Sequence, residues 1–172
     1  LTPYESSIYV VCDEVLPAIK EKNITYKNVE SPNKWIVKYT DSMSYPNFTE
    51  TVDTDRLTCV QTLEGYEAKV GTVQYSTKIN LEKKPTILDL GRVHETAQVF
   101  VNDQLVDTRI CFPYTFDLTN YIQSGENEIK IEVTNTLGTQ QRDYISHFMI
   151  IEPFGVEGPV SLTQGDLNET SI

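Results

Sequence analysis

The chain has 172 residues, of which 39% are hydrophobic and 10% aromatic, so it can bury a full core and is not expected to be disordered. Its formal net charge of −11 excludes a nucleic-acid surface and an anionic membrane surface, because phosphate groups are bound by clustered Lys and Arg. The sequence predicts no membrane-spanning segment, because it contains no apolar run of that length.

Residues 1–30 are expected to form a small, irregular N-terminal annex. The apolar run 8–11 predicts a strand that enters from a preceding domain. Residues 14–28 mix apolar and charged side chains without a clear period, so we interpret them as a loop or a short helix. Because the chain begins at Leu1 rather than Met, we expect it to be an excised piece of a longer protein.

Alternating side chains then predict a series of strands. Trp35, Val37 and Tyr39 share one face of segment 33–39, and the same period of two runs through segment 70–81. Both patterns are typical of half-buried strands, and they place Trp35 in the core. Further strands are predicted at residues 57–63, 86–90, 96–101, 105–106, 128–133, 147–151 and 159–162.

Two short segments between these strands have the residues of specific turns. Asn102 and Asp103 are suited to the positive φ angles of a type I′ hairpin. Thr119 is placed to cap one helical turn that Gly125 ends, with Ile122 closing the end of the core. Many short strands without intervening helices predict an all-β sandwich or barrel. Residues 31–172 are therefore expected to form one β domain behind the annex.

A set of motifs occurs in order along the chain, at Leu1–Ser6, Gly71–Thr77, Leu88–Val93, Val99–Asn102, Pro113–Thr119, Gly125–Asn135 and Gly155–Val160. This set resembles the galactose-binding-like jelly-roll domains of large glycoside hydrolases. The order and spacing of the motifs are most similar to the C-terminal region of family 106 α-L-rhamnosidase-like enzymes, and family 2 enzymes carry a similar domain. The resemblance implies a jelly-roll β-sandwich and a catalytic domain elsewhere in the parent chain. Asp103 departs from the pattern, since a Gly usually stands there.

The residue pattern does not predict a catalyst. A glycosidase places two carboxyl groups roughly 5 to 9.5 Å apart across the sugar, and the 25 acidic residues of this chain show no such marked pair. Glu152 and Asp143 have the least ordinary surroundings in the sequence, and surface carboxylates are mostly just solvated. His94 is expected to be exposed and His147 to be structural. The fragment is therefore predicted not to be an enzyme.

Carbohydrate binding requires aromatic faces beside polar groups. The aromatic residues predicted to lie in loops are Tyr45, Phe48, Tyr66, Phe112, Tyr114 and Tyr144. Tyr114 with Arg109, and Arg142 with Tyr144, are the pairings most typical of a sugar site. The alternative is that these side chains pack loops or dock onto a catalytic domain.

No cofactor is expected. The resemblance implies that a structural calcium is possible, but no calcium-binding loop is present, and Asp41, Asp53 and Asp55 could cluster only through folding. We therefore predict no metal site.

The three cysteines are expected to be buried free thiols, including Cys111 beside Phe112. A Cys12–Cys59 disulfide remains open if the parent protein is exported to the periplasm or outside the cell. Asn23, Asn47 and Asn168 match the N-glycosylation pattern, which also arises by chance. The compartment stays undetermined.

Three functions remain in competition. The first is a non-catalytic accessory β-sandwich that braces the catalytic domain of a multidomain glycoside hydrolase and adds carbohydrate contacts. The second is a stand-alone carbohydrate-binding module, which predicts an exposed aromatic platform at Tyr114 or Tyr144. The third is an adhesion or protein-interaction sandwich, which predicts a contiguous exposed apolar patch.

Overall fold

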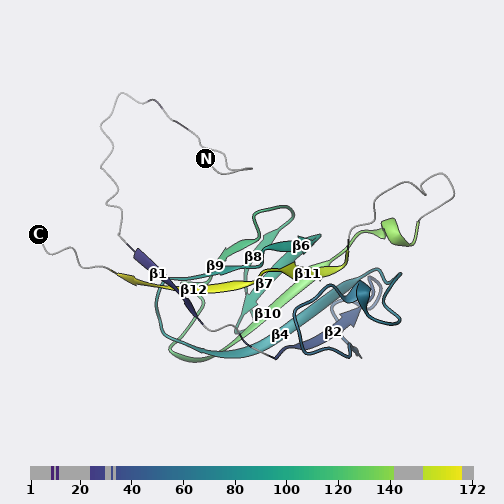
Figure 1. Ribbon diagram of the computed structural model, residues 1–172, viewed down its shortest axis with the longest axis horizontal. Helices are drawn as coiled ribbons and strands as arrows, with labels where there is room; N and C mark the ends of the chain where they lie inside the picture. Colours follow the sequence, from purple (N-terminus) through teal and green to yellow (C-terminus); the bar gives the residue numbers. More distant parts are fainter. Residues whose placement is uncertain are drawn as a thin grey trace, which may run out of the picture.

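Antiparallel sheets stack into an all-β sandwich in the computed structural model (Figure 1), which describes residues 24–29, 34–141 and 153–167 and the single positions 9, 11 and 32. The predicted strand at 147–151 lies wholly outside these residues, and the one at 8–11 lies partly outside them. In the described part of the chain, no helix is both long enough and apolar enough to span a membrane.

The larger sheet has six strands in the order β3-β2-β4-β10-β7-β8. Its two central strands are the longest, and they pair over their whole length. The bounds are β2 Ile36–Thr40, β3 Glu50–Thr51, β4 Thr72–Leu81, β7 Thr96–Val101, β8 Gln104–Arg109 and β10 Gly125–Thr134. The register sets Ile131 opposite Tyr75 and Glu132 opposite Gln74, so one face is apolar and the other polar. The alternation predicted at 70–81 and 128–133 is confirmed.

The smaller sheet has four strands in the order β1-β12-β5-β9. Their bounds are β1 Ile24–Val29, β5 Thr86–Asp89, β9 Thr115–Asp117 and β12 Ser161–Leu167. The prediction of a loop or short helix at 14–28 is wrong for the residues from Ile24 onward. These residues belong to β1, which pairs with β12 along six residues. Its four central residues are exposed, so this edge strand lacks the buried stripe by which a strand is predicted.

A third, two-stranded sheet is formed by β6 Arg92–His94 and β11 Gly155–Gly158. Gly155 has a φ of +122°, and a Cβ there would lie 2.3 Å from the Tyr75 hydroxyl oxygen and 2.9 Å from the Thr58 carbonyl oxygen. Only glycine combines this φ with so close an approach. The contact fixes β11, and with it β6, against the six-stranded sheet.

The core is filled from both sheets. Tyr75, Phe116 and Phe154 are the largest side chains that are fully buried, and Trp35 is buried as predicted, with 7% of its surface exposed. Ile122, also buried, belongs to the same core. Every buried polar side-chain atom in the described residues has a hydrogen-bond partner, as a close-packed interior requires.

Of the two predicted turns, one is confirmed and one is wrong, and one predicted strand is also wrong. Asn102 and Asp103 have φ angles of +51° and +64° and connect β7 to β8 as a hairpin, as predicted. Thr119 caps no helix, because its Oγ1 accepts a hydrogen bond from the backbone N–H of Thr86 and the chain there forms only a turn. Segment 57–63 is not a strand but contains the 3₁₀ turn η1, Val60–Thr62.

Candidate binding surface at the β8–β9 end

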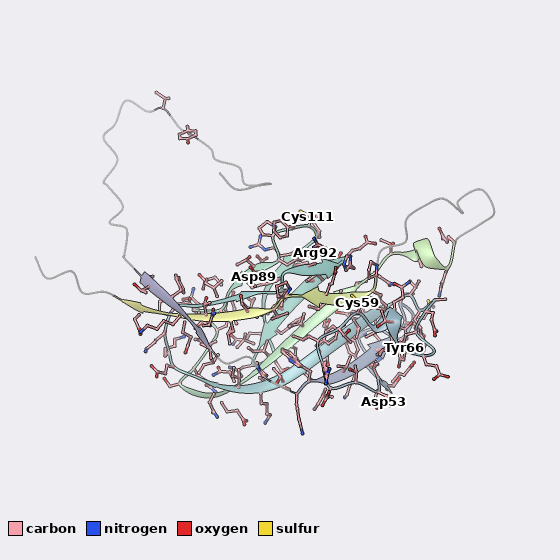
Figure 2. All side chains as sticks on the ribbon, in the orientation of Figure 1. Asp53, Cys59, Tyr66, Asp89, Arg92 and Cys111 are labelled. Carbon is pink, nitrogen blue, oxygen red and sulfur yellow. The ribbon has the colours of Figure 1, made fainter. Side chains whose placement is uncertain are left out.

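A depression of about 980 Å³ opens between β6 and the loop that joins β8 to β9. Figure 2 shows Arg92 and Cys111 at the same margin of the molecule, apart from Asp53 and Tyr66. The depression is lined by Arg92, Val93, His94, Glu95, Ile110, Cys111, Phe112 and Tyr114.

The rim of the depression exposes apolar side chains. Ile110 and Phe112 are 76% and 48% exposed, and Cys111 between them is also exposed. The expectation that Cys111 is buried is therefore wrong: the loop turns away from the sheets at this point. Exposed apolar side chains grouped on one loop are typical of a surface that contacts another molecule.

A charged cluster contributes Arg92 and His94 to the lining of the same depression. The Nε2 atom of His94 lies 2.9 Å from Glu157 Oε2, and Arg92 Nη1 lies 3.8 Å from Glu157 Oε1. The hydrogen bond from His94, assisted by the charge of Arg92, lowers the pKa of the Glu157 carboxyl. Glu157 therefore remains ionised near neutral pH. His94 belongs to this cluster, and only 15% of its side chain is accessible to solvent. The expectation that His94 is exposed is therefore wrong.

The second carboxylate of this end is also engaged. Glu95 Oε1 accepts a hydrogen bond of 3.0 Å from the Thr136 hydroxyl. The general acid of a glycosidase is a carboxyl group whose pKa is raised so that it keeps its proton. In the described ranges, each carboxyl group with a resolved shift has a lowered pKa; these groups are Asp41, Glu50, Glu157 and Asp166.

Tyr114 is a wall of the depression and not an aromatic platform. The residue is only 6% exposed, and its hydroxyl donates a hydrogen bond to the backbone carbonyl of Glu95. Burial of the ring raises the pKa of the Tyr114 hydroxyl. The expectation that Tyr114 presents an exposed face is wrong, because the residue enters the core where β9 begins.

The other predicted sugar-binding residues have different outcomes. Arg109 ends β8, its Nη2 lies 3.0 Å from Asp107 Oδ2, and its guanidinium carbon lies 5.9 Å from the centroid of the Phe116 ring. It borders the same loop as Tyr114, and its binding role stays a prediction. Arg142 and Tyr144 lie outside the described residues. In the described part of the chain, no group of His, Cys, Asp and Glu is placed to hold a metal ion.

Sequence reasoning placed Phe112 among the loop aromatic residues but did not predict that it forms an exposed apolar pair with Ile110. The available signal was an apolar run of three residues between Arg109 and Pro113, too short for a strand and placed at a chain reversal. Such a run is as typical of a buried loop as of a contact surface, so only the fold could separate the two.

Comparisons with known proteins indicate where this fold occurs. No protein-family model matches the chain. A putative β-glucuronidase of Formosa agariphila is 35% identical in an alignment over 78 residues that covers 42% of this chain and 7% of that protein.

Solved structures match over nearly the whole chain. The rhamnosidase of Novosphingobium sp. PP1Y superposes with a TM-score of 0.67 at 24% identity, covering 91% of this chain and 16% of that one. A β-glucuronidase of an uncultured Clostridium sp. gives a TM-score of 0.61 at 19% identity, covering 88% and 30%. The chain thus spans less than a third of the length of each of these three proteins. Its fold is an all-β sandwich that also forms one part of large glycoside hydrolases.

Proposed function

We propose that the chain is a non-catalytic accessory domain of a multidomain glycoside hydrolase, with a galactose-binding-like jelly-roll fold that resembles the one in family 106 rhamnosidase-like enzymes. The depression at the β8–β9 end is the surface by which it braces the catalytic domain. The observation that carries the proposal is the exposed apolar pair Ile110 and Phe112 beside the Arg92–His94–Glu157 cluster.

The composition of the surface supports a protein partner. Interfaces between folded domains combine an apolar centre with a polar rim. Ile110 and Phe112 supply apolar surface that gains stability on leaving water, at roughly 25 cal/mol per Å². The ion pairs beside them provide the rim. The size of the matched glycoside hydrolases, of which this fold is only a fraction, supports a partner in the same polypeptide.

The acidic groups support a non-catalytic role. Glu157 is held ionised by His94 and Arg92, so it is unsuited to donate a proton to a glycosidic oxygen. Glu95 accepts a hydrogen bond from Thr136. Catalysis is then assigned to another domain of the parent protein.

A comparison of Ile110→Asp with Ile36→Asp tests the proposal. Ile36 is a matched control, since it is 61% exposed but lies on β2 of the six-stranded sheet. Each variant is measured by thermal unfolding in the isolated chain and again in the full-length gene product. For each variant, the loss of stability in the isolated chain is subtracted from the loss in the full-length protein. The difference is the effect of the substitution on docking.

We expect Ile110→Asp to cost about 1–3 kcal/mol more in the full-length protein than in the isolated chain, because it places a charge in a desolvated interface. Ile36→Asp should cost the same in both contexts. Equal costs for Ile110→Asp in both contexts, or a gene product without a further folded domain, would contradict the proposal.

A further inference from the structure

A second hollow lies on the outer face of the six-stranded sheet, on different residues from the depression. It measures about 540 Å³ and lies where the loop after β2 crosses β4, β10 and β7. We call it the sheet groove; its lining residues are Ser42, Tyr45, Val70, Gly71, Thr72, Gln98, Thr134, Asn135 and Leu137. The side chains of Gln98 and Thr134 alternate with buried neighbours on their strands, so they face away from the core.

Tyr45 forms one wall of the sheet groove with its ring held in place. Its hydroxyl donates a hydrogen bond of 3.0 Å to Glu132 Oε2, and Gln74 Nε2 donates one of 2.9 Å to the other oxygen of the same carboxylate. The Tyr45 and Phe48 rings form an edge-to-face pair with their centroids 6.0 Å apart. The Tyr45 residue nevertheless keeps 43% of its surface exposed. Aromatic faces held in this way stack on the C–H face of a sugar ring.

The loop that carries Tyr45 is fixed by its own hydrogen bonds. Asp41 Oδ1 accepts hydrogen bonds from the backbone N–H groups of Met43 and Ser44, at 2.9 and 2.8 Å. Thr40 Oγ1 donates to the carbonyl of Asn47 at 2.9 Å. A ligand that meets a preformed wall loses less free energy to ordering it.

Small polar groups form the floor. The hydroxyl oxygens of Thr72 and Thr134 lie 2.8 Å apart, and Gln98 Nε2 donates to the Thr108 hydroxyl at 3.1 Å. Hydroxyl and amide groups can make further hydrogen bonds beyond one, so they can orient the hydroxyls of a bound sugar. Leu137, 49% exposed, gives the groove an apolar edge.

We propose that the sheet groove is a carbohydrate subsite for a neutral pyranose ring that stacks on Tyr45. The described residues that line the groove include no Lys or Arg, and the Glu132 carboxylate anchors the ring from beneath. A uronate would therefore bring a second negative charge towards Glu132 without a cationic partner. The choice of carbohydrate as the ligand rests on the proposed function, but the docking of the domain is not required.

The test is a ¹H–¹⁵N NMR titration of the isolated chain with methyl β-D-glucopyranoside, methyl α-L-rhamnopyranoside and sodium methyl β-D-glucuronate. The glucoside and the glucuronate differ only at the sixth carbon, so they isolate the effect of charge. We expect at least one neutral probe to shift the backbone signals of Tyr45, Gln98 and Thr134. The glucuronate should bind at least about tenfold more weakly, equivalent to about 1.4 kcal/mol.

Three substitutions locate the site. Tyr45→Ala should weaken the neutral sugar about tenfold, whereas Tyr26→Ala should not, because Tyr26 is 44% exposed but lies on β1 of the other sheet. Thr134→Val keeps the shape of the floor and removes one hydroxyl, so it should weaken binding severalfold even if Tyr45→Ala fails to fold.

Absence of groove shifts with both neutral probes in the folded chain would overturn the subsite. Equal binding of the glucuronate, or a Tyr26→Ala variant as weak as Tyr45→Ala, would do the same. These failures leave the docking result at Ile110 untouched. Conversely, loss of docking with sugar binding retained would overturn the accessory-domain proposal and keep the subsite.

Discussion

The two hollows of this sandwich differ in what they expose. The depression at the β8–β9 end presents the apolar side chains of Ile110 and Phe112 on a protruding loop, beside ion pairs. The sheet groove presents a fixed tyrosine ring over hydroxyl and amide groups. A protein surface favours the first composition and a small polar ring favours the second. We propose that these two compositions serve two binding functions on separate elements of one β-sandwich.

The largest expected loss of stability distinguishes a buried residue of the depression from an exposed residue at its rim. Tyr114→Ala should destabilise the isolated chain by about 3–5 kcal/mol, since it empties a buried aromatic position and removes a hydrogen bond to Glu95. Phe112→Ala, two residues earlier and half exposed, should change stability by less than about 0.5 kcal/mol.

Urea unfolding of the two variants measures this difference. If Tyr114→Ala were as stable as the wild type, the ring would be available at the surface, and the contrast between wall and rim would be lost.

Two glycines with a positive φ differ in what an added Cβ would contact. Gly155→Ala should cost more than about 2 kcal/mol, because its Cβ would overlap the Tyr75 hydroxyl at a φ of +122° and displace β11 beneath the depression. Gly125→Ala, at the start of β10, has a φ of +102° but no atom within 4 Å of the added Cβ, so it should cost about 1 kcal/mol of backbone strain.

Chemical denaturation of both variants gives the difference. Equal losses of stability would mean that the positive φ alone sets the cost of each substitution. The contact with Tyr75 would then not position β11.

The hydroxyl of Tyr45 gives a smaller effect, confined to the sheet groove. Tyr45→Phe removes the donor to Glu132, a buried carboxylate that keeps its bond from Gln74, so we expect a loss of about 1 kcal/mol. The same substitution should leave the alkylation rate of Cys111 in the depression unchanged. A change at Cys111 would show that the two hollows are coupled and not independent.

The smallest effect is a pH dependence in the depression. The pKa of Glu157 is lowered from 4.5 in the folded protein, so the unfolded chain binds this proton more readily. The stabilisation from Glu157 is therefore present above about pH 4.5 and is lost as the pH falls through the folded pKa. Glu157→Gln should be less stable than the wild type at about pH 7, and the gap should narrow at about pH 3. Urea unfolding at both pH values measures it; a gap that widens in acid would contradict the assigned pairing with His94.

Strands and hairpin could be predicted because their signals are local. The alternation in β4 and β10 reflects one buried face, and Asn102 with Asp103 tolerates the φ angles that the turn requires. The edge strand β1 could not be predicted, since its pairing with β12 depends on a backbone distant in sequence and buries little of its own surface.

The binding surfaces were less accessible to sequence reasoning. Tyr45 and Tyr114 are both tyrosines in turn-rich segments next to a proline, yet one is 43% and the other 6% exposed. The difference comes from the position of each segment: the Tyr114 ring fills space between sheets, whereas the Tyr45 ring lies across the outside of one sheet. No local pattern encodes that placement.

Alkylation of Cys111 tests most directly whether the depression docks onto another domain. The Cys111 side chain is exposed in this chain, whereas burial raises the pKa of the Cys59 thiol to about 11, so Cys59 serves as the unreactive internal reference. Iodoacetamide labelling, followed by peptide mass spectrometry, is compared between the isolated chain and the full-length gene product. We predict that Cys111 reacts readily in the isolated chain and at least about tenfold more slowly in the full-length protein, as expected for a thiol covered by an interface. Equal rates in the two contexts would contradict the docking of this surface.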